Sequence, residues 1–581
     1  MSNTKILSRS EIEHRISQGD AIVIFENSVL RMNKWIKYHP GGDKAVHHLV
    51  GRDATDEMIA YHCDETQATF KKWKIGEINY KWLNFLPPIQ GGKFRSFEEQ
   101  KWEKLNNEKP PREKLTPSSS SSEDFKLSSS TEPSDVEDVL INPKPEIQHK
   151  KMSGEQEVTI KPKIPQGFIP SLSTKEAYER KVIKDPSDVI DDYDNLKVEQ
   201  DLKSIPSLDY KTQQLLSDEY NKLHDVIIEG GFYQCPYWEY AKEASRIGTL
   251  FGIAFFLLYK RWLFTSAVFM GLAWQQLVFI AHDAGHISIT HHYQVDNIIG
   301  MVVASFIGGL SLGWWKRNHN VHHLITNDPV HDPDIQHLPF FAVSTRLFGN
   351  IYSTYYEKFL WFDEFAKKLI PIQEYMYYPI LCFGRFNLYR LSWQHVLMGE
   401  GPRHGKAAWF RYFELAGLIF FNYWFFYLIC YKTLETTSQR LVYILVSHIT
   451  TMIVHVQITL SHFAMSTSDL GVSESFVSRQ MRTTMDVDCP AWFDFFHGGL
   501  QFQAIHHLFP RIPRHNFRKI QPLVIGFCEK VGLKYSIYGF VDGNGVVIDR
   551  LADIAKQARI MRDCTKAMKK EAIEEGKYFD I

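Results

Sequence analysis

Four long apolar runs without a single Asp, Glu, Lys or Arg lie after residue 246 of this 581-residue chain, at 247–259, 262–280, 415–431 and 441–460. A membrane-spanning helix needs about 20 consecutive apolar residues, whereas a run of about 10–14 more often forms a buried core helix. Any one of these runs could instead form a buried core helix, and the run at 247–259 is short for a membrane span. Four such runs in one chain predict an α-helical membrane domain with about four transmembrane helices.

A fifth run, at 298–315, is rich in glycine and serine. We expect it to form an interfacial or re-entrant helix that does not cross the membrane, because irregular backbone at membrane depth is tolerated where protein buries it. Two spans then precede residue 282 and two lie between residues 323 and 503. The polar segments after these spans therefore return to the side of the N-terminus.

The charge and cysteine content exclude several classes of protein. The chain has 66 basic and 67 acidic side chains, a formal net charge of −1, so we expect no nucleic-acid partner. Its seven cysteines are scattered and form no CxxC pair, which argues against a disulfide framework or a thiolate zinc site and suits a reducing compartment. The N-terminal residues lack the pattern of a secretory signal, so we expect the N-terminus in the cytosol.

Composition divides the chain into five segments. Residues 1–85 alternate short apolar runs with helical patches and predict a small α+β domain. Residues 86–165 are rich in serine and proline and predict a disordered linker, with a root-mean-square reach of roughly 50 Å. An amphipathic juxtamembrane segment at 166–245, the membrane domain at 246–540 and a cytosolic helical tail at 541–581 follow.

The first candidate site lies in the N-terminal domain. An HPGG tetrapeptide begins at His39, and His62 follows a helical stretch and the segment GRDAT. HPGG alone is equally typical of a surface turn. Two imidazoles from neighbouring helices, however, can bind one iron from opposite sides, and glycines let backbone approach a porphyrin. We expect His47 and His48 to face solvent.

These residues resemble cytochrome b5, and the resemblance covers residues 1–85. It implies that His39 and His62 are the axial ligands of a b-type haem. A haem with two histidine ligands has no open coordination position. The resemblance therefore implies a domain that carries electrons and does not bind oxygen.

The second candidate site consists of three histidine clusters beside the apolar runs, which we call box one, box two and box three. On a helix, residues three or four apart share one face, so each box presents its imidazoles together. A metal site is expected where the boxes converge, and His462, after the fourth run, is a further candidate ligand. His448 and His455, in the same run, are expected to be structural. The boxes are His282 and His286; His319, His322 and His323; and Gln503, His506 and His507.

The ligand types and the N-terminal domain limit which metal ion the boxes are expected to bind. No cysteine lies near the boxes, and imidazole alone suits Fe, Zn, Cu or Ni. An electron carrier on the same chain favours iron, because oxygen activation consumes electrons. Asp332, Asp334 and His337 follow box two and are either partners that orient imidazoles or a polar helix cap.

The three boxes together resemble the membrane desaturases with a diiron centre. A cytochrome b5 fusion and glutamine at the start of box three are similar to their front-end branch, and the Ser-rich insertion is similar to that of the fungal Δ8-(E)-sphingolipid desaturases. The resemblance implies that the catalytic residues are the metal ligands of the boxes together with Gln503. It also implies two iron ions, O2, and NADH-derived electrons supplied through an external NADH-cytochrome b5 reductase.

The resemblance further implies a substrate and a location. The substrate would be the long-chain base of ceramide, which would gain a double bond at C8, expected to be trans, in the endoplasmic-reticulum membrane with the N-terminus and boxes cytosolic. Trp314, Trp315, Trp492 and Phe493 flank the boxes, where interfacial anchors would lie. The alternatives are a front-end Δ5 or Δ6 fatty-acyl desaturase, a sphingolipid or fatty-acid hydroxylase, and a non-catalytic membrane haem protein.

Overall fold

The computed structural model describes residues 5–92 and 186–574. Most of the segment expected to be a disordered linker, 86–165, therefore lies outside the described residues. Within the described part, the elements form one compact unit by their contacts.

The N-terminal domain is built on a three-stranded antiparallel sheet, β1 (Ile22–Phe25), β2 (Ser28–Arg31) and β3 (Lys74–Glu77), with β2 in the centre. Val23 pairs with Leu30, and both are buried in the domain core. Around the sheet lie four helices, α1 (Arg9–Ser17), α2 (Asp43–His47), α3 (Thr55–Tyr61) and α4 (Asp64–Gln67). This is the small α+β domain that the sequence predicts.

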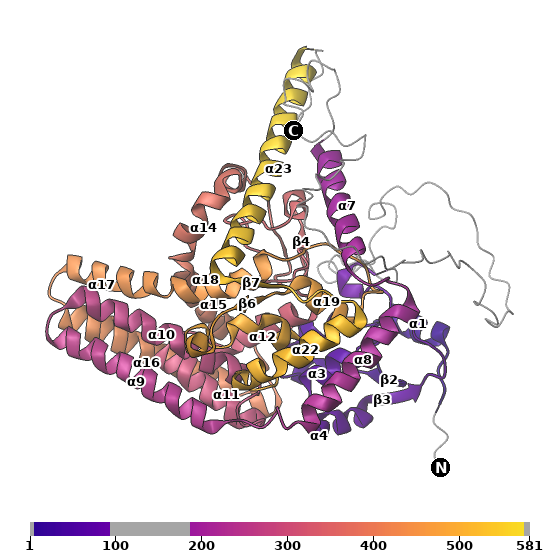
Figure 1. The fold of residues 1–581 in the computed structure, drawn as a ribbon, viewed down its shortest axis with the longest axis horizontal. Helices are drawn as coiled ribbons and strands as arrows, with labels where there is room; N and C mark the ends of the chain where they lie inside the picture. Colours follow the sequence, from indigo (N-terminus) through magenta and orange to yellow (C-terminus); the bar gives the residue numbers. More distant parts are fainter. Residues whose placement is uncertain (1–4, 93–185, 575–581) are drawn as a thin grey trace, which may run out of the picture. The chain divides into compact units, whose positions relative to one another are not determined.

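Three helical stretches among the described residues are long and apolar enough to cross a membrane: Leu263–Gly285, Gly405–Thr433 and Thr437–Phe463. The first is α10. The second contains α16 (Phe410–Phe421) and a π-helical continuation, and the third contains α17 (Thr437–Thr450) and α18 (Met452–Phe463). Helix α9 (Tyr237–Tyr259) packs along α10 (Figure 1), but its N-terminal part is charged and it is not among the three.

The glycine-rich fifth run bends sharply. Residues Tyr293–Ile307, comprising α11 (Tyr293–Met301) and a π-helical turn, meet α12 (Leu312–Leu324) at 117°. The break is fixed by Ser311, whose hydroxyl accepts a hydrogen bond from the Trp314 backbone N–H and begins α12. This geometry agrees with the expected re-entrant helix, and if the bent pair counts as one span the described residues hold up to four.

A set of helices and one short sheet supports box three. The two-stranded parallel sheet of β6 (Asp486–Asp488) and β7 (Ile537–Gly539) lies beside α21 (Gln503–Leu508). Helices α8 (Tyr210–Glu229), α19 (Phe476–Thr483), α21 and α22 (Phe517–Val531) share one hydrophobic core. The C-terminal helix α23 (Phe540–Glu574) is continuous and packs along α7 (Pro186–Ser204) (Figure 1).

The remaining elements connect these parts. They are α13 (Ala366–Leu369), α14 (Gln373–Leu381), α15 (Gly384–Met398), α20 (Asp494–His497) and the two-stranded sheet of β4 (Tyr352–Ser353) and β5 (Lys358–Phe359).

Candidate functional site

Box one closes the last turn of α10. His282 and His286 lie one turn apart, with ring centroids separated by 4.7 Å. Between them, Gly285 lets α12 approach closely, because a Cβ on this residue would lie 2.0 Å from Cζ3 of Trp315. Trp315 stacks on His319 of box two, with ring centroids 4.5 Å apart. Trp315 was expected to be an interfacial anchor. That expectation is wrong, because the indole packs among the box histidines.

Box two lies on α12 and is oriented by carboxylates of the following loop. His322 Nδ1 lies 2.8 Å from Asp332 Oδ2, and His319 Nδ1 lies 3.3 Å from Asp334 Oδ2. Asp332 is completely buried. A hydrogen bond at Nδ1 fixes the ring and leaves Nε2 for a metal. The two aspartates therefore act as orienting partners, whereas His337 packs against Phe463.

Box three lies on the short helix α21, which is buried along its whole length. Its first turn is held by Asp486, whose Oδ1 accepts a hydrogen bond from the Ala504 N–H at 2.9 Å. His507 Nδ1 lies 2.9 Å from Oε1 of Gln480 on α19. Burial lowers the pKa of His506 and His507 well below the usual range, so both imidazoles are neutral and able to bind a metal.

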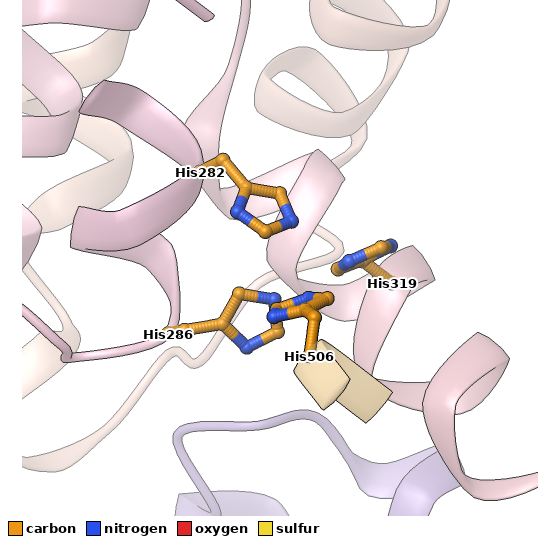
Figure 2. Close-up of side chains that lie close together, drawn as sticks. All are labelled: His282, His286, His319 and His506. Carbon is orange, nitrogen blue, oxygen red and sulfur yellow. The ribbon is translucent and has the colours of Figure 1, made fainter. Parts of the chain in front are cut away.

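The boxes converge in two groups of imidazoles. Within each group, one nitrogen of every ring lies within 4.8 Å of the others. The first group takes rings from all three boxes, and Figure 2 shows them pointing toward one another. The second group includes His462, which α18 supplies. The first group is His282, His286, His319 and His506; the second is His322, His462 and His507.

His323 lies between the two groups. Its ring centroid is 4.7 Å from that of His506 in the first group and 4.0 Å from that of His507 in the second. Its Nε2 lies 3.0 Å from Nε2 of His319. Gln503 is buried one turn before His506, and its Oε1 has no hydrogen-bond partner within the described part of the chain.

The nitrogens of these groups fit bound metal ions. Several of them are buried and have no hydrogen-bond partner within the described part of the chain: Nε2 of His282, His286, His506 and His507, and Nδ1 of His323 and His462. A buried polar atom without a partner is costly and rare in a folded protein. Coordination to a metal would satisfy these atoms, and two groups could hold two ions.

The expected haem ligands face each other in the N-terminal domain. The ring centroids of His39 and His62 are 6.3 Å apart. Each Nδ1 is hydrogen-bonded to backbone, His39 to Gly42 O at 2.8 Å and His62 to Met58 O at 2.9 Å, so both Nε2 atoms remain free. Two metal–imidazole bonds of about 2.0 Å each, plus the distance from each bonded nitrogen to its ring centroid, add up to about this separation of the centroids. Burial lowers the pKa of His62 to about 4, which keeps it neutral.

Helix α12 joins the two candidate sites, a relation that the sequence did not reveal. Asn320 Nδ2 donates a hydrogen bond to Gly41 O at 3.1 Å, two residues after His39. The Tyr61 ring, next to His62, meets the His323 ring edge-on at 6.1 Å. Box two is thus in contact with both haem-ligand loops.

His48 was expected to face solvent, and that expectation is wrong. It is 1% exposed, and its imidazole lies within hydrogen-bond distance of Gln90 and of Thr354 in the membrane domain. Gln90 belongs to the segment expected to be a linker. The hydrogen-bonded structure of the N-terminal domain therefore extends past residue 85.

Comparisons with known proteins agree with this architecture. The family model described as fatty acid desaturase matches residues 260–539, and the one described as cytochrome b5-like heme/steroid binding domain matches residues 8–79. The chain is 66% identical over 571 residues to a Delta 8-(E)-sphingolipid desaturase of Lachancea kluyveri, covering 98% of this chain and 97% of the relative.

More distant fungal relatives carry the same name. The Candida albicans protein is 59% identical over 579 residues, covering 97% of this chain and 98% of the relative. The Emericella nidulans protein is 49% identical over 574 residues, covering 98% and 99%. These matches run over both candidate sites. The chain therefore belongs to the fatty acid desaturase family, as a membrane oxidoreductase with a cytochrome b5-like domain at its N-terminus.

Proposed function

We propose that this enzyme is a Δ8-(E)-sphingolipid desaturase that introduces a trans double bond at C8 of the long-chain base of ceramide. The observation that carries the desaturase chemistry is the position of box two on α12. Box two supplies imidazoles to both groups, and α12 also contacts the loops of the two facing histidines, His39 and His62. The fungal relatives, which match along nearly the whole chain, support the substrate and the position of the double bond.

The proposed cofactors follow from the donor sets. His39 and His62 would hold a b-type haem. Two iron ions would lie at the two groups of the boxes, with His323 between them and Gln503 nearby in box three. When bound, the haem supplies single electrons and the iron pair supplies the oxidising power, taken from O2, that removes hydrogen from an unactivated CH2.

The chain's own residues position these groups. Asp332 and Asp334 hold the imidazoles of His322 and His319 with their free nitrogens toward the sites. Burial of box three excludes water from that side. No acid, base or nucleophile is required from a side chain, so the catalytic residues are the metal ligands. The protein's contribution is orientation and a dry environment.

The proposed partners and location are those of a microsomal electron-transfer chain. An NADH-cytochrome b5 reductase would reduce the haem, and the substrate would enter from the lipid bilayer of the endoplasmic reticulum. The contacts of α12 with the N-terminal domain support a common, cytosolic side for the haem and the boxes, because electrons must pass between them.

The test is expression in a yeast that makes only saturated long-chain bases, supplied with a C4-unsaturated base if needed. Hydrolysis of the lipids and mass spectrometry should reveal an 8-unsaturated or 4,8-diunsaturated base, absent with a His506→Ala variant. A new double bond confined to fatty acyl chains would indicate a Δ5 or Δ6 acyl desaturase instead. A hydroxylated base would indicate a hydroxylase.

A further inference from the structure

Lys316, in the second turn of α12, is a buried cation whose charge is not used by the site described above. Its side chain is 9% exposed, and Nζ has no hydrogen-bond partner within residues 5–92 and 186–574. Nζ lies over the face of the Tyr293 ring, 5.0 Å from the ring centroid. Burial lowers the pKa of this amine to about 7, because an ammonium group without a partner is expensive to bury. A bound anion beside Nζ would stabilise the charged form.

The carboxylate that attracts Lys316 is already engaged by other groups. Asp296 accepts hydrogen bonds from the backbone N–H and the hydroxyl of Thr290. Asp296 forms no hydrogen bond with Nζ of Lys316. A bound anion could supply the partner that residues 5–92 and 186–574 do not give this amine.

At the residue after Lys316, helix α12 packs against the loop that carries a proposed haem ligand, because a Cβ on Gly42 would lie 3.1 Å from Cγ of Arg317. Lys316 lies four residues before Asn320, so both side chains are on the same face of α12. The Asn320 amide is hydrogen-bonded to Gly41 O, and a Cβ on Gly41 would lie 2.9 Å from the His39 ring and 3.0 Å from Asn320. The charge of Lys316 acts on the His39 imidazole and also on that of His286 in box one. Lys316 therefore lies near the His39 loop as well as near the boxes.

We propose that Lys316 binds a propionate carboxylate of the haem, so that the membrane domain supplies one wall of the haem site. This inference rests on the proposed haem between His39 and His62. Haem brings two carboxylates at its edge, which are the chemical class that an unpartnered ammonium requires. The haem would then stabilise the contact between the two domains, because His39 belongs to the N-terminal domain and Lys316 to the membrane domain.

The experiment measures haem release from the full-length protein to excess apomyoglobin. The chain is loaded either with haem b or with haem dimethyl ester, whose propionates carry no charge. Lys316→Met should release haem b roughly tenfold faster than the wild type, the effect of losing one charge-assisted hydrogen bond. With the dimethyl ester, the wild type and Lys316→Met should release haem at equal rates. Lys316→Arg should stay close to the wild type with both haems.

The matched control is Lys37→Met. Lys37 is an exposed lysine two residues before His39, over the Tyr38 ring, and its removal should leave haem b release unchanged. A second readout is the haem midpoint potential, which should become more negative in Lys316→Met because an uncompensated propionate favours the ferric form. Should Lys316→Met not accumulate, Lys316→Gln provides the same comparison.

Two results would overturn the inference. One is equal release of haem b from the wild type and Lys316→Met, as expected if an uncharged Lys316 amine simply packs on Tyr293. The other is an equal acceleration with both haems, which would reveal a structural effect independent of the propionates. Failure of the proposed haem site itself looks different, because the wild-type chain would then bind no haem with a low-spin spectrum.

Discussion

At the residue scale, a hydrogen bond at Nδ1 orients the imidazole of several histidines in the two proposed sites. His322 and His319 use Nδ1 toward carboxylates, and His507 uses Nδ1 toward an amide oxygen. His39 and His62 use Nδ1 toward backbone carbonyls. In each case the bonded nitrogen fixes the tautomer and ring orientation, which presents the other nitrogen to the site.

Asp332→Asn tests this positioning. The amide preserves the shape but removes the charge that holds His322, so we expect affinity for iron to fall about 10- to 100-fold. Iron per chain after dialysis against a chelator, with haem measured by absorbance, checks the result. Asp328→Asn is the matched control, since Asp328 lies in the same loop and accepts hydrogen bonds from Val330 and His331 backbone. Equal iron retention by Asp332→Asn and the wild type would contradict the orienting role.

The two cofactor sites should be separable by single histidine variants. His39→Ala or His62→Ala should abolish the low-spin haem spectrum while iron remains in the boxes, because the two sites use different side chains. His506→Ala should keep the haem and lose desaturation. Optical spectra, iron content and the lipid assay, measured on all three variants, check that each variant damages one site and spares the other. A His506→Ala enzyme with near-wild-type desaturation would be incompatible with the diiron proposal.

Asp486 should make stability depend on pH. Burial raises its pKa from 3.8 to about 7, although the hydrogen bonds that the carboxylate accepts from Ala504 and Tyr535 oppose this shift. The folded state therefore holds the proton more tightly than the unfolded state. The stabilisation is complete below pH 3.8 and is lost as the pH rises through about 7.

Thermal unfolding in detergent between pH 5 and pH 8 measures this dependence. The melting temperature of the wild type should fall relative to that of Asp486→Asn as the pH rises, because asparagine does not titrate. Asp488→Asn, at an exposed position of the same strand, is the control and should follow the wild type. Parallel pH profiles for the wild type and Asp486→Asn would refute the expectation.

At the scale of the helical elements, the site depends on how closely α10 approaches α12. Gly285→Ala should lower the free energy of unfolding by about 1–3 kcal/mol and reduce iron content, because the added Cβ would collide with Trp315, which stacks on His319. Thermal unfolding and iron analysis check the prediction. Gly252→Ala in α9 is the control, since nothing lies within 4 Å of its added Cβ, and alanine should stabilise that helix slightly. Wild-type iron content in Gly285→Ala would show that α12 can shift without damage to the site.

At the scale of the whole molecule, the N-terminal domain is part of the enzyme's packing. Ala60 of α3 belongs to the same hydrophobic core as residues of α8, α19, α21 and α22. Asp56 accepts hydrogen bonds from Ser217 and Asn221 of α8. These contacts hold the loops of His39 and His62 against box two, so the proposed electron delivery would not depend on the chance encounter of two freely moving domains.

The ion pair between Lys44 and Glu357 tests this docking. The Lys44 side chain is 7% exposed, so Glu357→Lys should loosen the contact, and the Lys44→Glu/Glu357→Lys double variant should restore part of it. Hydrogen–deuterium exchange of residues 41–47 and the yield of 8-unsaturated base report the effect. The exposed pair Lys367–Glu364 is the control, since such a pair is worth about 0–1 kcal/mol. No change in exchange in Glu357→Lys would argue against docking through this pair.

The sequence by itself determined the parts whose physics is local. Run length and the absence of charge predicted the three candidate membrane helices, whereas the run at 247–259 was wrongly expected to be a fourth and lies in α9. Spacings of three and four residues placed the histidines of each box on one helical face. HPGG and His62 predicted the proposed haem site in the same way, because ligand type and backbone freedom are properties of short segments.

Only the tertiary structure decided which imidazoles share a group. His319 and His322 are neighbours on one helix and both lie near Asp334, yet the four-histidine group takes His319 and the three-histidine group takes His322 together with His462 from α18. The tertiary structure also decided that Trp315 stacks on His319, that His48 is buried, and that Asn320 contacts the His39 loop. The reason is that these relations depend on how side chains of distant helices interlock, and helical periodicity gives the face of each helix but not the partner against which that face packs.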